Sequence, residues 1–294
     1  MSDMKNKAEE VLAARLERAY ALMSPCRLCP RKCLVQRDAG EVGFCGSPAE
    51  AVIASAGPHF GEEAPLVGMG GSGTIFLAGC NLPCVFCQNY DISHNLAGTV
   101  TSASELARLM LDLQGRLCHN INFVTPSHSS AVIMDAIIRA RKQGLRVPIV
   151  YNCGGYESLE TLRLLDGLVE IYMPDFKFWD RTTAATYCSA PDYPDVARAA
   201  FREMHRQVGD LAMSDGLATR GLLVRHLVMP GQAEQAKEIL EFLASEISPN
   251  TFVNVMGQYR PMHCAARYPE INRRPADAEV IDAKALAARL GLRS

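Results

Sequence analysis

Residues 77–89 read LAGCNLPCVFCQN and place three cysteines, Cys80, Cys84 and Cys87, within eight residues. The run 74–78 before them is rich in β-forming residues, so it predicts a strand whose carboxyl end carries the three thiols. A structural zinc site normally takes four protein ligands, and no fourth ligand lies nearby in the sequence. Three thiolates suit a 4Fe-4S cluster in which one iron has no protein ligand, and such an iron can bind a small molecule.

From this strand onward, β-rich runs alternate with stretches of helical pattern. The predicted strands are 74–78, 121–125, 147–152, 168–173, 221–229 and 251–256. The predicted helices cover about residues 102–116, 129–143, 157–165, 193–209, 233–245 and 276–291. This alternation predicts an α/β fold with a parallel sheet, either open or curled into a partial barrel. In both cases the ligand is expected at the carboxyl ends of the strands.

The chain before the first predicted strand contains a second group of cysteines. Residues 5–23 have the spacing of an amphipathic helix, and residues 26–45 read CRLCPRKCLVQRDAGEVGFC. The latter segment supplies four thiols, Cys26, Cys29, Cys33 and Cys45. Four thiolates complete a closed site with a structural or electron-transfer role, which fits a second iron–sulfur cluster or zinc. Free buried cysteines are the simpler alternative. Residues 46–73, rich in Gly, Ala and Pro, are predicted to be a connector.

Composition excludes several classes of protein. Of the 294 residues 48% are hydrophobic, which is enough for a large folded core. The net charge, 30 − 32 = −2, gives no electrostatic basis for binding nucleic acid or an anionic membrane. Eleven cysteines, an odd number in a long chain, argue against a secreted disulfide scaffold. The cysteines outside the two groups are expected to pack in the core; these are Cys118, Cys153, Cys188 and Cys264.

The N-terminal stretch has no apolar run and carries Asp3, Glu9, Glu10 and Glu17, so it reads as neither a signal peptide nor a transit peptide. No stretch approaches eighteen consecutive apolar residues, as a membrane span requires. The sequence therefore predicts a cytoplasmic protein that binds neither membrane nor nucleic acid.

The cysteine signature of residues 79–89, Gly-Cys-Asn-Leu at its start and Gln-Asn at its end, resembles the radical S-adenosylmethionine (SAM) superfamily. It looks most like the branch of the pyruvate formate-lyase activating enzymes, in particular the uncharacterised activase-like iron–sulfur proteins with an N-terminal cysteine cluster. The resemblance covers roughly residues 70–262. It implies a partial (β/α)6 barrel and a 4Fe-4S cluster held by three cysteines and SAM. It also implies reductive cleavage of SAM to methionine and a 5′-deoxyadenosyl radical, which abstracts a hydrogen atom from the substrate.

This resemblance divides the chain into three parts. Residues 1–69 are predicted to form an N-terminal helix and a Cys-rich metal-binding extension. Residues 70–262 are the predicted radical SAM core, and residues 263–294 a C-terminal tail and helix. The predicted fold class is therefore α/β: a partial (β/α)6 barrel of the radical SAM type with a Cys-rich N-terminal extension.

Further site residues follow from the resemblance. Where the superfamily has a Gly-Gly-Glu-like segment after the second strand, this chain reads NFVTPSH at 122–128. Thr125, Ser127 and His128 are the candidates there for binding the SAM amino group; alternatively they form a turn that starts the next helix. The segment RHLVMPG at 225–231 resembles the family's Arg-x4-Pro-Gly segment. Arg225 is thus expected to contact the SAM carboxylate or ribose, or to pair within the barrel.

The ends of the third and fourth strands, YNCGGY at 151–156 and MPDFK at 173–177, resemble segments that hold a monovalent cation in glycyl-radical activases. By position, the cation-site residues with their neighbouring lysine are Asn152, Cys153, Met173, Asp175 and Lys177. A strand-end Asp–Lys pair on the surface is the alternative. At the end of the sixth strand Asn254, Gln258 and Tyr259 are expected to reach adenine or substrate.

The function implied by the resemblance is that of an activating-enzyme-like oxidoreductase. It would install a glycyl radical on a partner enzyme and take electrons from an external flavodoxin- or ferredoxin-like donor. The departures at NFVTPSH and YNCGGY make a radical SAM enzyme that modifies a small metabolite or peptide the alternative. A two-cluster electron carrier is a more distant one.

Overall fold

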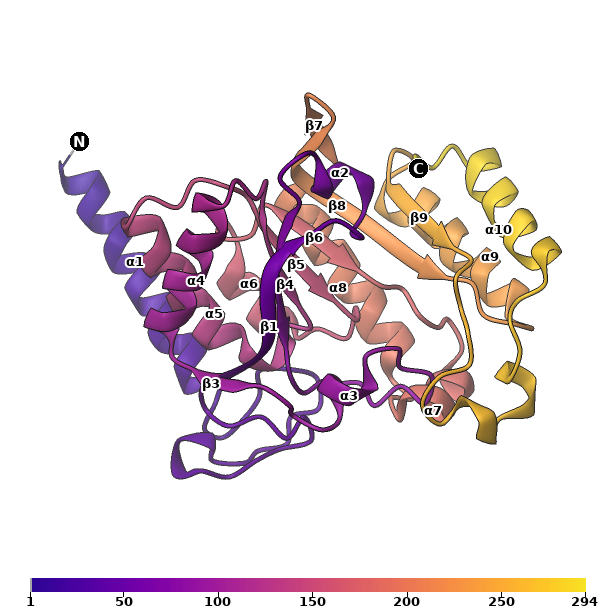
Figure 1. Ribbon diagram of the computed structural model, residues 1–294, viewed down its shortest axis with the longest axis horizontal. Helices are drawn as coiled ribbons and strands as arrows, with labels where there is room; N and C mark the ends of the chain where they lie inside the picture. Colours follow the sequence, from indigo (N-terminus) through magenta and orange to yellow (C-terminus); the bar gives the residue numbers. More distant parts are fainter. Residues whose placement is uncertain (1) are drawn as a thin grey trace.

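Six parallel strands form the centre of the protein (Figure 1). The structure, a computed structural model, describes residues 2–294, and for residues 2–6 and 8 it describes only the backbone. Neighbouring strands of the central six pair in parallel in the order β2, β4, β5, β6, β8, β9. Their bounds are Ser72–Leu77, Ile121–Val124, Ile149–Cys153, Ile171–Pro174, Leu217–Leu227 and Phe252–Met256. The six predicted strands and their parallel pairing are confirmed.

Three antiparallel strands make the sheet mixed. β1 (Ala51–His59) pairs with β2, β3 (Thr99–Thr101) with β1, and β7 (Ala212–Ser214) with β8. The predicted connector is therefore wrong at residues 51–59. In the sequence, Gly57 and Pro58 suggest a turn. In the structure β3 pairs only with Ala51–Ile53 of β1, so the β3 side of β1 is unpaired at Pro58. A proline, which has no N–H to donate, is tolerated at such an edge. One sheet thus runs across the predicted boundary at residue 69.

Helices cover the outer face of the sheet. The predicted helices are present as α1 (Ser2–Ala21), α4 (Ala103–Gly115), α5 (Ser130–Lys142), α6 (Leu159–Leu165), α8 (Tyr193–Val208), α9 (Ala233–Phe242) and α10 (Asp277–Arg289). The sequence analysis missed α2 (Ala64–Val67), α3 (Tyr90–Ser93) and α7 (Arg181–Cys188). Short 3-10 turns lie at Arg37–Ala39, Ser127–Ser129, Ala265–Arg267 and Pro269–Ile271, and a π-helical turn at Leu243–Ile247. None of these described helices is both long and apolar enough to cross a membrane.

The sheet has a hydrophobic core on each face. The larger core joins the sheet to the helices and includes Ile75, Phe123 and Tyr151. A smaller core lies beneath α2, where Leu66 packs with Val150, Ile171, Met173 and Leu223. The segment between β1 and β2 therefore covers part of the inner face. Closure of the sheet into a partial barrel stays a prediction.

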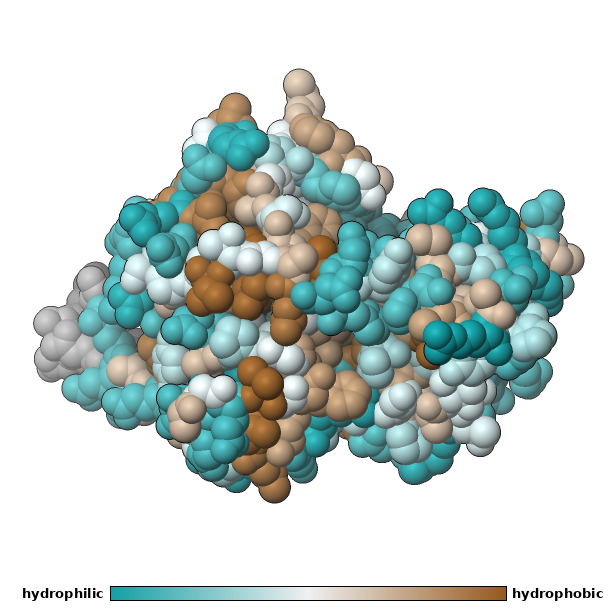
Figure 2. All heavy atoms as spheres, turned by 60° about the horizontal axis from the view of Figure 1, so that its bottom comes forward, coloured by the Kyte–Doolittle hydropathy of each residue, from teal (hydrophilic) through white to brown (hydrophobic). Residues whose placement is uncertain are grey.

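The Cys-rich extension packs on the carboxyl ends of the strands. Arg37 is buried and donates hydrogen bonds to the carbonyl oxygens of Pro48 and His128, the latter at 2.7 Å. Thr161 Oγ1 donates to the Leu28 carbonyl at 2.6 Å. Figure 2 brings the bottom of Figure 1 forward and shows hydrophobic side chains scattered among polar ones on that face. Within residues 26–45, the exposed large hydrophobic residues are Leu34, Val42 and Phe44.

Candidate functional site

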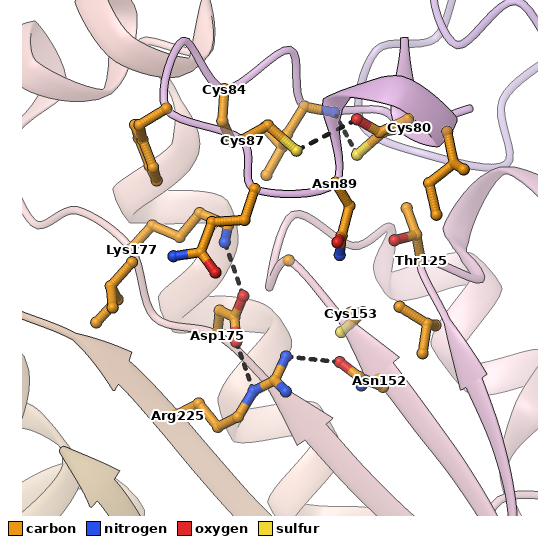
Figure 3. Close-up of a pocket in the computed structure, with 18 of the residues that line it drawn as sticks. Cys80, Cys84, Cys87, Asn89, Thr125, Asn152, Cys153, Asp175, Lys177 and Arg225 are labelled. Atoms are coloured by element: carbon orange, nitrogen blue, oxygen red, sulfur yellow. Dashed lines mark hydrogen bonds and ion pairs between the residues drawn. The ribbon is translucent and has the colours of Figure 1, made fainter. Parts of the chain in front are cut away.

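A cavity of about 270 Å³ opens at the carboxyl ends of the parallel strands. Cys80, Cys84 and Cys87 line one end of it, and a group of charged side chains lies opposite them (Figure 3). Ten of the nineteen predicted site residues line this cavity: Cys80, Cys84, Cys87, Thr125, Asn152, Cys153, Asp175, Lys177, Arg225 and Gln258. All six parallel strands contribute to the lining at or just beyond their carboxyl ends, as the position of ligands in α/β folds predicts.

The loop that carries the three thiols is held by close backbone packing. Gly79 has φ +85°, and a Cβ there would lie 2.8 Å from the Cys45 carbonyl oxygen, so a glycine is required at this turn. Asn81 donates from Nδ2 to the Tyr156 carbonyl at 2.8 Å, and the Leu82 N–H points at Cys80 Sγ at 3.3 Å. The loop is thereby fixed between the extension on one side and the end of β5 on the other.

The donor set fits the predicted cluster in kind and number. All three thiols face one cavity, and soft thiolates are the usual ligands of iron–sulfur clusters. Among the side chains that the structure describes, however, no three Cys, His, Asp or Glu residues are grouped as the ligands of one metal ion. The metal sites therefore stay predictions.

The charged group opposite the thiols is centred on Asp175. Its two carboxylate oxygens accept from Arg225 Nε at 2.8 Å and from Lys177 Nζ at 2.7 Å, and Arg225 also donates to Asn152 Oδ1 at 2.7 Å. Burial alone would raise the pKa of Asp175, but Arg225 and Lys177 hold it below its ordinary value. The Asp–Lys pair faces the cavity rather than the surface, and Arg225 pairs within the sheet, as the alternative for this residue predicts.

The sequence analysis missed the acidic residue behind this group. Glu62, which precedes α2, accepts from Asn122 Nδ2 at 2.8 Å and lies 3.5 Å from an Arg225 nitrogen. Its neighbour Glu63 accepts from Asn254 Nδ2 at 2.7 Å, so Asn254 is engaged there. Both glutamates come from a segment with no recognisable pattern, and only the pairing of β1 with β2 brings them to the site.

Other candidates support the fold instead of lining the cavity. His128 is buried, its Nε2 lies 2.9 Å from the Ala78 carbonyl oxygen, and burial lowers its pKa to about 4. The side chain of Met173 belongs to the core beneath α2. Tyr259 is buried and donates to the Ile271 carbonyl, so its predicted reach to a ligand is wrong. Gln258, in contrast, lines the cavity.

Ser127 contacts a buried carboxyl group that the sequence analysis also missed. Glu157 accepts hydrogen bonds from the hydroxyl groups of Ser127 and Tyr151, the latter at 3.1 Å. Burial raises the pKa of Glu157 to about 7, although its hydrogen-bond partners, which include the Cys153 thiol, lower it. The group ties the turn after β4 to the loop after β5, directly behind the cavity.

Glu157→Gln is expected to flatten the dependence of stability on pH. Because the folded-state pKa lies above the ordinary value of 4.5, the Glu157 carboxyl stabilises the folded state at low pH. That contribution is lost as the pH rises through about 7. The wild type should therefore lose on the order of 2–3 kcal/mol more than the variant between about pH 5 and about pH 8.

Urea unfolding of both proteins across this range measures the difference. Glu9→Gln, on an exposed helical position, is the control and should follow the wild type. Parallel curves for the wild type and Glu157→Gln would show that Glu157 does not titrate differently on folding.

The second group of cysteines shares one tightly turned segment. The Cys26 N–H donates to Val35 O at 2.9 Å, the Leu34 N–H donates to Cys26 O at 3.1 Å, and the Phe44 N–H points at Cys33 Sγ at 3.4 Å. Burial raises the pKa of Cys29 to about 12 and also raises that of Cys45. The neighbouring cysteines add to both shifts by electrostatic interaction.

Two of the four cysteines assigned to core packing are close to the cavity. Cys153 lines it, and Cys188, at the end of α7, lies with its sulfur 3.2 Å from Cys84 Sγ. Cys118 is buried in the main core, as predicted, while Cys264 is partly exposed. The contact of Cys188 with Cys84 has no signal in the sequence, because α7 itself was not predicted.

Comparison with known proteins found a relative over nearly the whole chain. No protein-family model matches. "Uncharacterized protein MJ0674" of Methanocaldococcus jannaschii is 31% identical over 301 aligned positions, which cover 99% of this chain and 82% of the relative.

Among solved structures, a domain of a pyruvate-formate lyase-activating enzyme from Bacteroides vulgatus has a TM-score of 0.41 at 18% identity and covers 56% of this chain and 89% of that one. SuiB of Streptococcus suis bound to S-adenosylmethionine has a TM-score of 0.49 at 10% identity and covers 73% of this chain and 47% of that one. At TM-scores below 0.5, these likenesses identify neither the fold nor the function. The 31% identity over 99% of this chain and 82% of the relative does show kinship: the chain belongs to the family of Uncharacterized protein MJ0674.

Proposed function

We propose that the protein is a radical SAM enzyme. The observation that carries this proposal is that three thiols and a charged group, Asp175 with Lys177 and Arg225, line opposite ends of one cavity. The thiols suit a cluster with one open iron, and the charged group suits a zwitterionic ligand beside it. This cavity lies at the ends of parallel strands, which we propose curl into the partial barrel that the resemblance implies.

In the proposed enzyme, Cys80, Cys84 and Cys87 hold a 4Fe-4S cluster. When bound, this cluster supplies the electron that cleaves SAM to methionine and a 5′-deoxyadenosyl radical, which abstracts a hydrogen atom from the substrate. Arg225 and Lys177 provide fixed positive charge for the SAM carboxylate, and Asp175 orients both side chains. Asn152, Cys153 and Asp175 are the candidates for holding a monovalent cation, and the turn at Thr125 for the SAM amino group.

The apolar part of the lining is expected to exclude water from the radical. It consists of Leu77, Leu82, Phe86, Leu227, Met229 and Met256. Reactive intermediates need such protection from side reactions.

We further propose that the substrate is a protein, on which the enzyme installs a glycyl radical. The MPDFK segment supports this role, because it resembles the activase segment and its Asp175 and Lys177 line the cavity. Electrons would come from an external flavodoxin- or ferredoxin-like donor. None of the eleven cysteines is in a disulfide in the described structure, which agrees with the proposed cytoplasmic location.

For the extension, we propose a second, closed metal site on Cys26, Cys29, Cys33 and Cys45, occupied by an iron–sulfur cluster or zinc. Its support is the tight turn that carries the four thiols and the direct packing of Cys45 on Gly79. This packing joins the two cysteine groups without an intervening helix or strand.

The anaerobically reconstituted, reduced protein is expected to convert SAM to 5′-deoxyadenosine, measured by chromatography. If a candidate glycyl radical enzyme is then added, a persistent glycyl signal in the electron paramagnetic resonance spectrum is expected. SAM cleavage without that signal for any candidate partner would favour a small metabolite or peptide as substrate. A protein that holds iron but does not cleave SAM would contradict every proposal of radical SAM chemistry. The two-cluster electron carrier would then be the remaining function.

A further inference from the structure

Each thiol of the central loop has a hydrogen-bonding neighbour of its own. The Leu82 N–H lies 3.3 Å from Cys80 Sγ, the Cys188 sulfur 3.2 Å from Cys84 Sγ, and Ser93 Oγ 3.2 Å from Cys87 Sγ. When Cys84 is a cluster ligand its sulfur is a thiolate and carries no proton. The hydrogen bond to it then has to be donated by the Cys188 S–H group.

Cys188 is held in this position by both neighbouring loops. Its carbonyl oxygen accepts from Arg31 at 3.0 Å, and the same guanidinium donates to the Asn81 carbonyl, next to Cys80, at 2.9 Å. One residue before Cys188, the Tyr187 carbonyl accepts from the Val85 N–H at 2.9 Å. The end of α7 is therefore fixed against the loop that carries the three thiols.

The burial of Cys188 fits a supporting role rather than direct ligation. The residue is 0% exposed, and it does not belong to the cavity lining, which holds the other sulfurs. Its thiol thus lies behind Cys84 and away from the space in which a cluster and its ligand would lie. A sulfur in that position can reach the Cys84 sulfur but does not face the open side of the site.

We propose that Cys188 is a positioning residue of the central site: its thiol donates a hydrogen bond to the Cys84 thiolate and raises the reduction potential of the cluster. This inference rests on the proposed function, because it needs a cluster on Cys80, Cys84 and Cys87. A reduced cluster carries one more negative charge than the oxidised one. A donated hydrogen bond therefore stabilises the reduced form more, and hydrogen bonds to the sulfurs are among the factors that set cluster potentials. The dry surroundings strengthen the effect.

Ser93 is a second residue placed to donate a hydrogen bond to a thiolate of the central loop, in this case that of Cys87. If the Ser93 hydroxyl donates to Cys87, its oxygen is free to accept, and His94 Nδ1 lies 2.8 Å from it. The His94 ring packs against His263 with 4.7 Å between the ring centroids. This arrangement holds Ser93 in place, and unlike Cys188 it is partly exposed.

A redox titration of the reconstituted full-length protein tests the proposal, with the reduced cluster measured by electron paramagnetic resonance. Cys188→Ala is expected to shift the ratio of reduced to oxidised cluster at a fixed potential about tenfold toward the oxidised form, a lowering of about 59 mV for one electron. Cys188→Ser keeps a donor and should recover most of this shift. Cys118→Ala removes a buried cysteine that does not line the cavity and should leave the potential unchanged.

If Cys188→Ala does not fold, Cys188→Val fills the same space without a donor and carries the same expectation. An unchanged potential in a variant that still holds the cluster overturns the inference. Loss of iron as complete as in Cys80→Ala would make Cys188 a ligand and also overturns it. Absence of a cluster from the wild type is a different failure, because it contradicts the proposed function itself.

Discussion

Cys80→Ala is expected to abolish SAM cleavage and to remove the iron of the central site. The Cys80 thiol is one of the three thiols of the central loop that line the cavity, and Cys84 and Cys87 alone cannot hold a cluster whose remaining iron must stay open for SAM. Substitution of residues that only hydrogen-bond to metal ligands already lowers metal affinity or activity about 10–100-fold. Loss of a ligand should therefore lower activity by at least about 100-fold. Iron and sulfide analysis with the cleavage assay on anaerobically purified protein measures both effects.

The matched variants separate the two cysteine groups. Cys29→Ala should remove the metal of the extension and leave the central iron in place, whereas Cys118→Ala, in the main core, should lose neither metal. Zinc instead of iron lost from Cys29→Ala would identify the second site as zinc. Cys80→Ala with the iron content and activity of the wild type would refute Cys80 as a ligand of the central cluster, and with it the three-cysteine site on the loop after β2.

The parallel core was predictable because each of its strands is a short apolar run in the sequence, separated from the next strand by a stretch with the hydrophobic periodicity of a helix. The antiparallel strand β1 was not, since Gly57 and Pro58 interrupt its pattern and the pairing with β2 supplies its stability. The helix α7 was missed for a similar reason. Its buried residues, Ala184, Tyr187 and Cys188, give it only a short apolar stripe in eight residues.

The candidate site was predictable where strand ends carry the chemistry. Asp175, Lys177 and Arg225 follow recognisable segments, and the order of the strands brings them together. Glu62 and Glu157 lie in turns whose position depends on tertiary pairing, so their side chains gave no signal. A carboxylate that contacts residues from two other segments cannot be found from local spacing alone.

Asp175→Asn is expected to destabilise the protein strongly, even before any cofactor is bound. The change keeps the size of the side chain but removes the charge that pairs with Lys177 and Arg225, whose side chains are only 19% and 17% exposed. Burial lowers the pKa of Lys177, and Asp175 with other neighbouring groups raises it well above its ordinary value, so this lysine depends on its partner for its charge. Breaking a buried ion pair costs about 3–5 kcal/mol, and we expect the lower end because a fifth of the side chains reaches solvent.

Asp112→Asn provides a comparison in which the same chemical change removes an exposed pair. Asp112, on α4, lies 3.6 Å from Arg116, the residue directly after the helix. Both side chains are at least half exposed, and such pairs contribute about 0.3–0.5 kcal/mol. In denaturant unfolding of the cofactor-free chain, Asp175→Asn should therefore lose several-fold more free energy of unfolding than Asp112→Asn. Equal losses of unfolding free energy in the two variants would mean that solvent and Glu62 stabilise the positive charges of Arg225 and Lys177 once Asp175 is neutral. In that case the two cations are free to bind a ligand carboxylate without Asp175, and the role of Asp175 in orienting them would be refuted.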